Sequence, residues 1–73
     1  MISQKEIWAV LSGEMKRDEW IALDAIYELI SQRIPVRDEP VPRWRRNVRN
    51  VLQRRKASGE VEWNGHGAYR LPK

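Results

Sequence analysis

Residues 43–57 carry the pattern that most constrains how this 73-residue chain can fold. Four apolar residues recur here at intervals of four, three and one, so they fall on one side of a helix with 3.6 residues per turn. They are Trp44, Val48, Val51 and Leu52. All other positions from 43 to 56 hold Arg, Asn, Gln or Lys. The segment is therefore predicted to form an amphipathic helix whose narrow apolar stripe needs a second surface to cover it.

The charge of this segment differs from that of the rest of the chain. Residues 41–58 hold seven basic side chains and no acidic one, whereas residues 1–40 hold five basic and eight acidic side chains. Because the formal net charge of the whole chain is only +4, one segment carries more than the entire excess. An ordinary solvated helix face usually mixes the two signs. A cationic element beside an acidic remainder therefore predicts binding to a polyanion.

The length and composition of the chain exclude several classes of protein and several kinds of functional site. A chain of 73 residues forms one small domain. Because the chain has no cysteine, disulfides and thiolate metal sites are excluded, and because it has only one histidine, multi-histidine metal sites are excluded as well. No cofactor site and no catalytic residue are predicted, since the sequence holds no nuclease motif. It also lacks an apolar run of about eighteen residues and a signal-peptide core, so a cytoplasmic protein is expected.

A first helix is predicted over residues 4–12. Ser3 and Glu6 match a capping box, in which the two side chains bond reciprocally to backbone N–H groups at the start of a helix. Three apolar residues then follow at helical spacing: Ile7, Val10 and Leu11. We expect Gly13 to end this helix in a left-handed cap.

A second helix is predicted over residues 23–33. Its apolar positions keep helical spacing over three turns; they are Leu23, Ile26, Tyr27, Ile30 and Ile34. Pro35 ends it, because proline disfavours helical geometry in the residue before it. Just upstream, Trp20 and Ile21 are predicted to form a short extended piece. A proline-rich connector follows, and Pro42 suits the first turn of the basic helix.

The end of the chain is predicted to form a β-hairpin. Gly59 ends the basic helix, and two runs with alternating apolar residues flank the four-residue loop 64–67. Four of these apolar side chains are expected to cover the open edge of the core: Val61, Trp63, Tyr69 and Leu71. Three helices followed by a two-stranded hairpin, with a third short strand near Trp20, predict an α+β winged helix-turn-helix domain over residues 1–73.

Three stretches of the chain carry a resemblance to a known group. Trp20–Ile30 reads WIALDAIYELI, Pro42–Gln53 reads PRWRRNVRNVLQ, and Ser58–Leu71 contains a glycine, a strand, a G-x-G turn and an aromatic-basic-leucine end. These stretches resemble the winged-helix domains of modification-dependent restriction endonucleases, including the N-terminal domain of Mrr-type enzymes and the winged helix of methyladenine-dependent endonucleases. The resemblance implies a module that targets double-stranded DNA carrying N6-methyladenine. It also implies a nuclease domain of a type IV or IIM-like enzyme outside these residues.

A set of side chains is predicted to contact DNA through the basic helix, the wing and the turn before the helix. Arginine pairs with guanine, and asparagine or glutamine pairs with adenine, so Asn50 and Gln53 are candidate adenine contacts. Trp44 is interpreted either as a core anchor or as a base contact. Arg55 lies on the apolar side and is expected to lay its stem over the core. The full predicted set is Arg37, Arg43, Trp44, Arg45, Arg46, Arg49, Asn50, Gln53, Arg54, Asn64 and His66.

Two other function classes stay open at this point. A sequence-specific transcription regulator would use the same helix, although regulators commonly bind as dimers and the chain shows no dimerisation helix. A protein-interaction domain would instead use the acidic segment 1–40, with Trp8 and Trp20 docking a partner.

Overall fold

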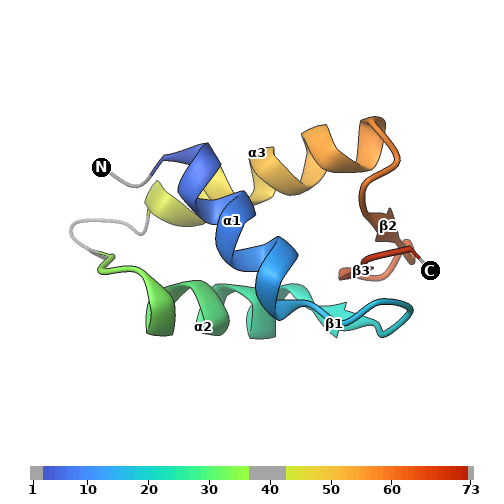
Figure 1. Ribbon diagram of the computed structural model, residues 1–73, viewed down its shortest axis with the longest axis horizontal. Helices are drawn as coiled ribbons and strands as arrows, with labels where there is room; N and C mark the ends of the chain where they lie inside the picture. Colours follow the sequence, from blue (N-terminus) through green and yellow to red (C-terminus); the bar gives the residue numbers. More distant parts are fainter. Residues whose placement is uncertain (1–2, 37–42, 73) are drawn as a thin grey trace.

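The computed structural model describes residues 3–36 and 43–72, which form three α-helices and one three-stranded antiparallel sheet. In chain order the elements are α1 (Gln4–Glu14), β1 (Ile21–Ala22), α2 (Leu23–Arg33), α3 (Arg43–Ala57), β2 (Glu62–Trp63) and β3 (Ala68–Arg70). α1 crosses α2 and α3, and the sheet lies at the end of the molecule where α3 ends and α2 begins (Figure 1). The predicted α+β class and order of elements are confirmed. No described helix is long and apolar enough to cross a membrane.

α1 starts as predicted but extends two residues further. The Ser3 side chain accepts a hydrogen bond from the Glu6 backbone N–H, as expected for the N-cap. The prediction that Gly13 ends this helix is wrong, because the backbone N–H of Met15 still donates to Leu11 O at 2.9 Å. Leu11 and Met15 are both buried, so packing of the apolar face carries the helix past the glycine.

α2 has the predicted bounds. Ile34, the residue before Pro35, is extended and caps the helix by donating its N–H to Ile30 O. The prolines of the predicted connector at 40 and 42 lie outside the described residues.

β3 is the central strand of the sheet, in the order β1-β3-β2. Tyr69 pairs with Ile21 on one side and with Trp63 on the other. The short extended piece predicted near Trp20 is therefore a paired strand that begins one residue later. The Leu23 N–H donates to Gly67 O at 2.8 Å and so joins the start of α2 to the hairpin loop.

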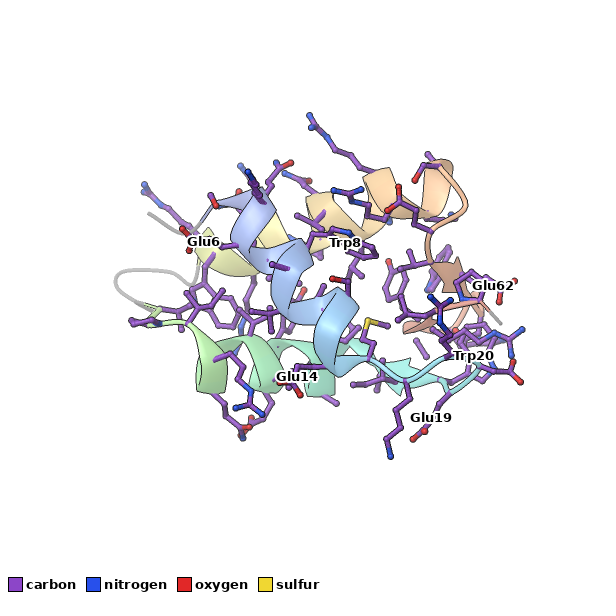
Figure 2. The ribbon with its side chains drawn as sticks, viewed as in Figure 1. Glu6, Trp8, Glu14, Glu19, Trp20 and Glu62 are labelled. Atoms are coloured by element: carbon purple, nitrogen blue, oxygen red, sulfur yellow. The ribbon has the colours of Figure 1, made fainter. Side chains whose placement is uncertain are left out.

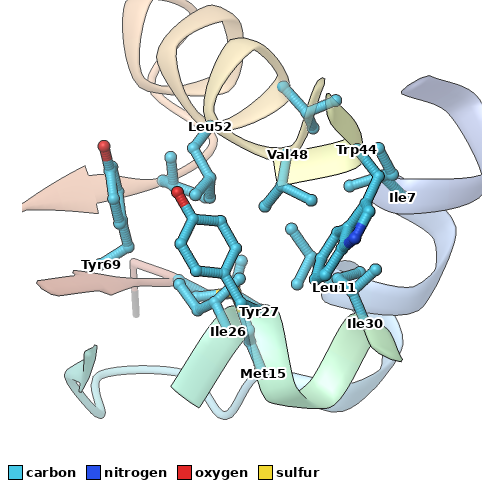
Figure 3. Packing of buried hydrophobic residues seen from close by; sticks show 13 residues of the cluster. Ile7, Leu11, Met15, Ile26, Tyr27, Ile30, Trp44, Val48, Leu52 and Tyr69 are labelled. Carbon is cyan, nitrogen blue, oxygen red and sulfur yellow. The ribbon is translucent and has the colours of Figure 1, made fainter. Parts of the chain in front are cut away.

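The core lies between the three helices and the inner face of the sheet (Figure 3). All four apolar residues of the α3 stripe are buried, and Val61, Tyr69 and Leu71 cover the edge of the core as predicted. The prediction that Trp63 joins them is wrong, since its side chain is 42% exposed. β2 is an edge strand, and both of its residues, Glu62 and Trp63, are exposed.

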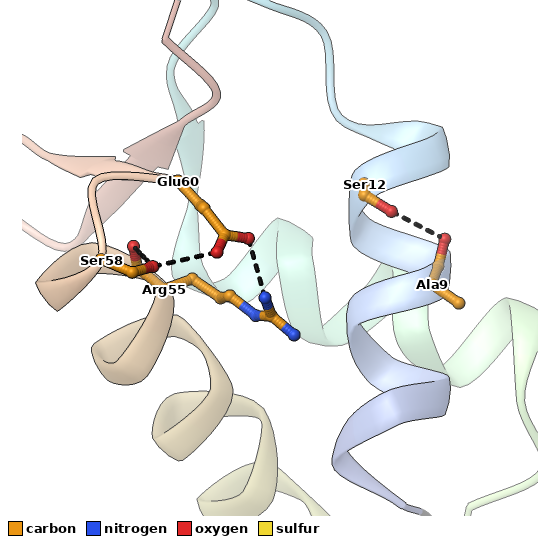
Figure 4. A network of polar contacts seen from close by, with 5 residues as sticks. All are labelled: Ala9, Ser12, Arg55, Ser58 and Glu60. Atoms are coloured by element: carbon orange, nitrogen blue, oxygen red, sulfur yellow. Dashed lines mark hydrogen bonds and ion pairs between the residues drawn. The ribbon is translucent and has the colours of Figure 1, made fainter.

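α3 ends at Ala57, and Gly59, the residue predicted to stop it, terminates it two residues later. Gly59 has a φ of 82°, its N–H donates to Lys56 O, and the Glu60 N–H donates to Arg55 O at 2.8 Å. This pair of bonds closes the helix end through a left-handed residue. The Arg55 guanidinium pairs with the Glu60 carboxylate at 2.8 Å, and the Ser58 hydroxyl donates to the same carboxylate (Figure 4). Arg55 is thereby turned away from the open face of α3.

Candidate nucleic-acid interface

The outer surface of α3 holds five exposed arginines that form no ion pair with a described carboxylate. They are Arg43, Arg45, Arg46, Arg49 and Arg54. Three other arginines behave differently: Arg55, near the end of α3, and Arg33 and Arg70, outside it, each pair with one or two carboxylates. The cationic charge of α3 is thus left facing solvent, while its opposite side is packed in the core.

One edge of this outer surface rests on aromatic rings from three other elements. The Arg45 guanidinium lies over the ring of Tyr27 from α2, 5.1 Å from its centroid. The Gln53 amide donates to the Tyr69 hydroxyl of β3 at 3.5 Å. Further along, the Lys56 ammonium lies 4.7 Å from the ring centroid of Trp63 in β2. We call the row Arg45, Arg49, Gln53 and Lys56 the aromatic-backed edge of α3.

The two tyrosines behind this edge stay uncharged at neutral pH. Burial raises the pKa of both Tyr27 and Tyr69 above its ordinary value, and the positive charge of Arg49 offsets part of that rise in each case. Neither phenol therefore supplies a negative charge that would neutralise the arginines beside it.

Trp44 lies inside the fold rather than on the basic surface. Its side chain is 6% exposed and meets the Tyr27 ring edge-on, with centroids 5.8 Å apart and an interplanar angle of 86°. The structure therefore favours the interpretation of Trp44 as a core anchor over that of a base contact. Arg55 has the expected boundary position, with its guanidinium 4.6 Å from the ring centroid of Trp8.

The remaining candidates on α3 differ in their surroundings. Asn50 is exposed on the outer surface between the arginines, so its amide can meet a ligand directly. Gln53 is also exposed, but its amide is oriented by the bond to Tyr69. Arg37 lies outside the described residues.

The hairpin loop is organised by Asn64. Its side-chain oxygen accepts hydrogen bonds from the backbone N–H of His66 at 2.6 Å and of Ala68 at 3.1 Å. Asn64 therefore shapes the loop, and only the nitrogen of its amide is left to face a ligand. The His66 side chain is exposed at the tip, between Gly65 and Gly67, which both have positive φ.

An open pocket of about 360 Å³ marks the boundary of the basic surface. It lies between α2 and the start of α3 and is lined by Asp24, Tyr27, Glu28, Ser31, Trp44 and Arg45. Two carboxylates on the α2 side, Asp24 and Glu28, disfavour an anionic ligand there. These carboxylates separate the cationic outer surface of α3 from the exposed side of α2.

Sequence reasoning missed the ring contacts of the aromatic-backed edge. It assigned Tyr27, Trp63 and Tyr69 to the core by their spacing, and no local pattern links them to α3. The one available signal in the sequence was the excess of basic residues in one segment of a chain that also holds several aromatic residues.

Comparison of the chain with protein-family models, curated proteins and solved structures gives no match.

Proposed function

We propose that this chain is a winged-helix DNA-binding domain that places α3 in the major groove of a duplex. The observation that carries the proposal is the division of α3 into two sides. Its apolar stripe is buried, whereas five arginines without carboxylate partners among the described residues point to solvent. Such a helix suits a duplex, which presents closely spaced phosphates and a groove about 12 Å wide that admits a helix about 10–12 Å across.

The other elements suit this arrangement. α2 and α3 correspond to the helix pair of a helix-turn-helix, and the hairpin that begins after Gly59 corresponds to the wing. The fifteen residues of α3 extend over about 22 Å, enough to follow the groove for part of one turn. Asn50 is the outward amide best placed to meet an adenine edge, with the arginines beside it bonding to guanine or to phosphates.

A preference for N6-methyladenine and a link to a nuclease domain remain part of the proposal. Both depend on the resemblance of the three stretches of sequence to modification-dependent restriction endonucleases. The buried position of Trp44 means that a methyl group would be met by exposed α3 or hairpin side chains.

Fluorescence anisotropy with a labelled duplex of about 20 base pairs tests duplex binding. We expect the wild-type chain to bind, and Arg45→Ala and Arg49→Ala each to lose about 1–3 kcal/mol of binding free energy. Lys5→Ala is the matched control, since it removes one exposed positive charge from α1 and should bind like the wild type. Absence of duplex binding at low salt, with retention of a protein partner, would support the interaction-domain alternative.

The methylation preference has its own comparison. One duplex is prepared unmodified, with N6-methyladenine and with 5-methylcytosine, and the three affinities are measured under the same conditions. A higher affinity for the methyladenine duplex is expected. Equal affinities would remove the methylation claim and leave duplex binding intact.

A further inference from the structure

Trp63 is a large exposed side chain held in a fixed place beside the basic surface. The residue is 42% exposed, and its ring stacks on Tyr69, with centroids 6.3 Å apart and planes 21° from parallel. Tyr69 is buried and hydrogen-bonded to Gln53, so the surface on which Trp63 rests is itself immobilised by α3. A rigid, solvent-facing indole of this kind is a preformed contact surface for a ligand with a flat face.

The charge around Trp63 identifies the kind of ligand. The Lys56 ammonium lies over the ring, and Lys56 continues the aromatic-backed edge that includes Arg49. A ligand that reaches the indole must therefore carry negative charge as well as a flat apolar face. A nucleotide has both features, because its base can stack on the ring while its phosphate pairs with the lysine.

A fully paired duplex does not offer such a base, since its base faces are covered by their neighbours. We propose that Trp63 stacks on an unpaired nucleotide, so that the chain prefers a duplex that continues into a single strand. The duplex part lies on α3 and the first unpaired base lies on Trp63, with Lys56 moving from the ring to the adjoining phosphate. This inference rests on the proposed duplex binding and names the form of DNA that the site selects.

Trp20, which directly precedes β1, provides a matched control. It has the same exposed fraction, 42%, but its ring lies under the guanidinium of Arg70, 4.4 Å from the ring centroid. Arg70 and Tyr69 are successive residues of β3 and so point to opposite faces of the sheet. Trp20 lies with Glu62 at the sheet end of the molecule (Figure 2), and Arg70 pairs with Glu62 and Asp18 there. Trp20 is therefore not expected to contact DNA.

The experiment compares three labelled DNAs of one sequence: a blunt duplex, the same duplex with an unpaired extension of six nucleotides, and the single strand alone. We expect the extended duplex to bind about 5- to 150-fold more tightly than the blunt one, the range measured for stacking of one base on one aromatic side chain. Trp63→Ala should abolish this difference, so that the blunt and extended duplexes bind this variant equally. Trp63→Phe should keep most of it, and Trp20→Ala should keep all of it.

The outcomes separate the two proposals. Equal affinity for blunt and extended duplexes, or a difference that survives Trp63→Ala, overturns the role of Trp63 while duplex binding stands. Failure to bind any duplex overturns the proposed function, and the inference with it. Circular dichroism of each variant checks that the fold is retained, and Trp63→Phe keeps the test decisive if the alanine variant unfolds.

Discussion

Val48 and Arg49 are neighbours in the chain, and replacing each by alanine should distinguish a residue that stabilises the fold from a residue of the proposed DNA-binding surface. Val48 is fully buried in α3 with 0% exposure, whereas Arg49 is exposed. Val48→Ala removes two methyl groups, worth about 0.8 kcal/mol each, and the space left behind raises the total loss to about 2–3 kcal/mol. For a domain of this size each kcal/mol corresponds to roughly 4–8 °C in Tm, so the variant should melt about 10–20 °C lower.

Arg49→Ala, in contrast, should leave the stability of the fold almost unchanged. It removes an exposed side chain that forms no ion pair with a described carboxylate, so the free energy of unfolding should stay within about 0.5 kcal/mol of the wild type. Thermal and urea unfolding followed by circular dichroism measures both variants under one set of conditions. A large loss of stability in Arg49→Ala, or a loss below about 1 kcal/mol in Val48→Ala, would refute the orientation of α3 described above.

Three further predictions concern the fold. Ser3→Ala removes the side-chain acceptor for the Glu6 N–H and should cost about 1 kcal/mol in urea unfolding, whereas Ser3→Asp should cost little. Gly59→Ala places a side chain at a φ of 82° and should cost about 1–2 kcal/mol, visible as a lower Tm. Because burial raises the pKa of Tyr27 and Tyr69, the folded state holds both phenolic protons more tightly than the unfolded state. Their contribution to stability is thus complete below about pH 10 and is lost as the pH rises through the folded-state pKa values, so unfolding free energies measured at pH 9 and pH 11 should fall with pH.

The helices could be predicted closely because several local signals agree. In α2 the spacing of the apolar residues and the position of Pro35 give the same bounds, and in α3 the stripe and Gly59 do the same. α1 shows the limit of such signals. Gly13 is compatible with a cap, but the tertiary packing of Met15 decides where the helix ends.

The surface contacts could not be predicted from local pattern. The alternation of apolar residues predicts the same burial for Val61 and Trp63, yet only Val61, just before β2, is buried. Which of the two is covered depends on how the hairpin packs against the helices, and that is a property of the whole fold. The contacts of α3 with Tyr27, Trp63 and Tyr69 join elements far apart in the sequence for the same reason.

The salt dependence of duplex binding tests the free cationic side of α3 most directly. Five arginines that have no carboxylate partner among the described residues correspond to a slope of about −4.5 in log K against log salt if each lies against a phosphate. Removing two of them in an Arg43→Gln, Arg54→Gln double variant should bring the slope to about −2.7 with little change in Tm. Affinity that does not respond to salt, or a double variant with the slope of the wild type, would show that the exposed arginines of α3 do not lie against phosphates.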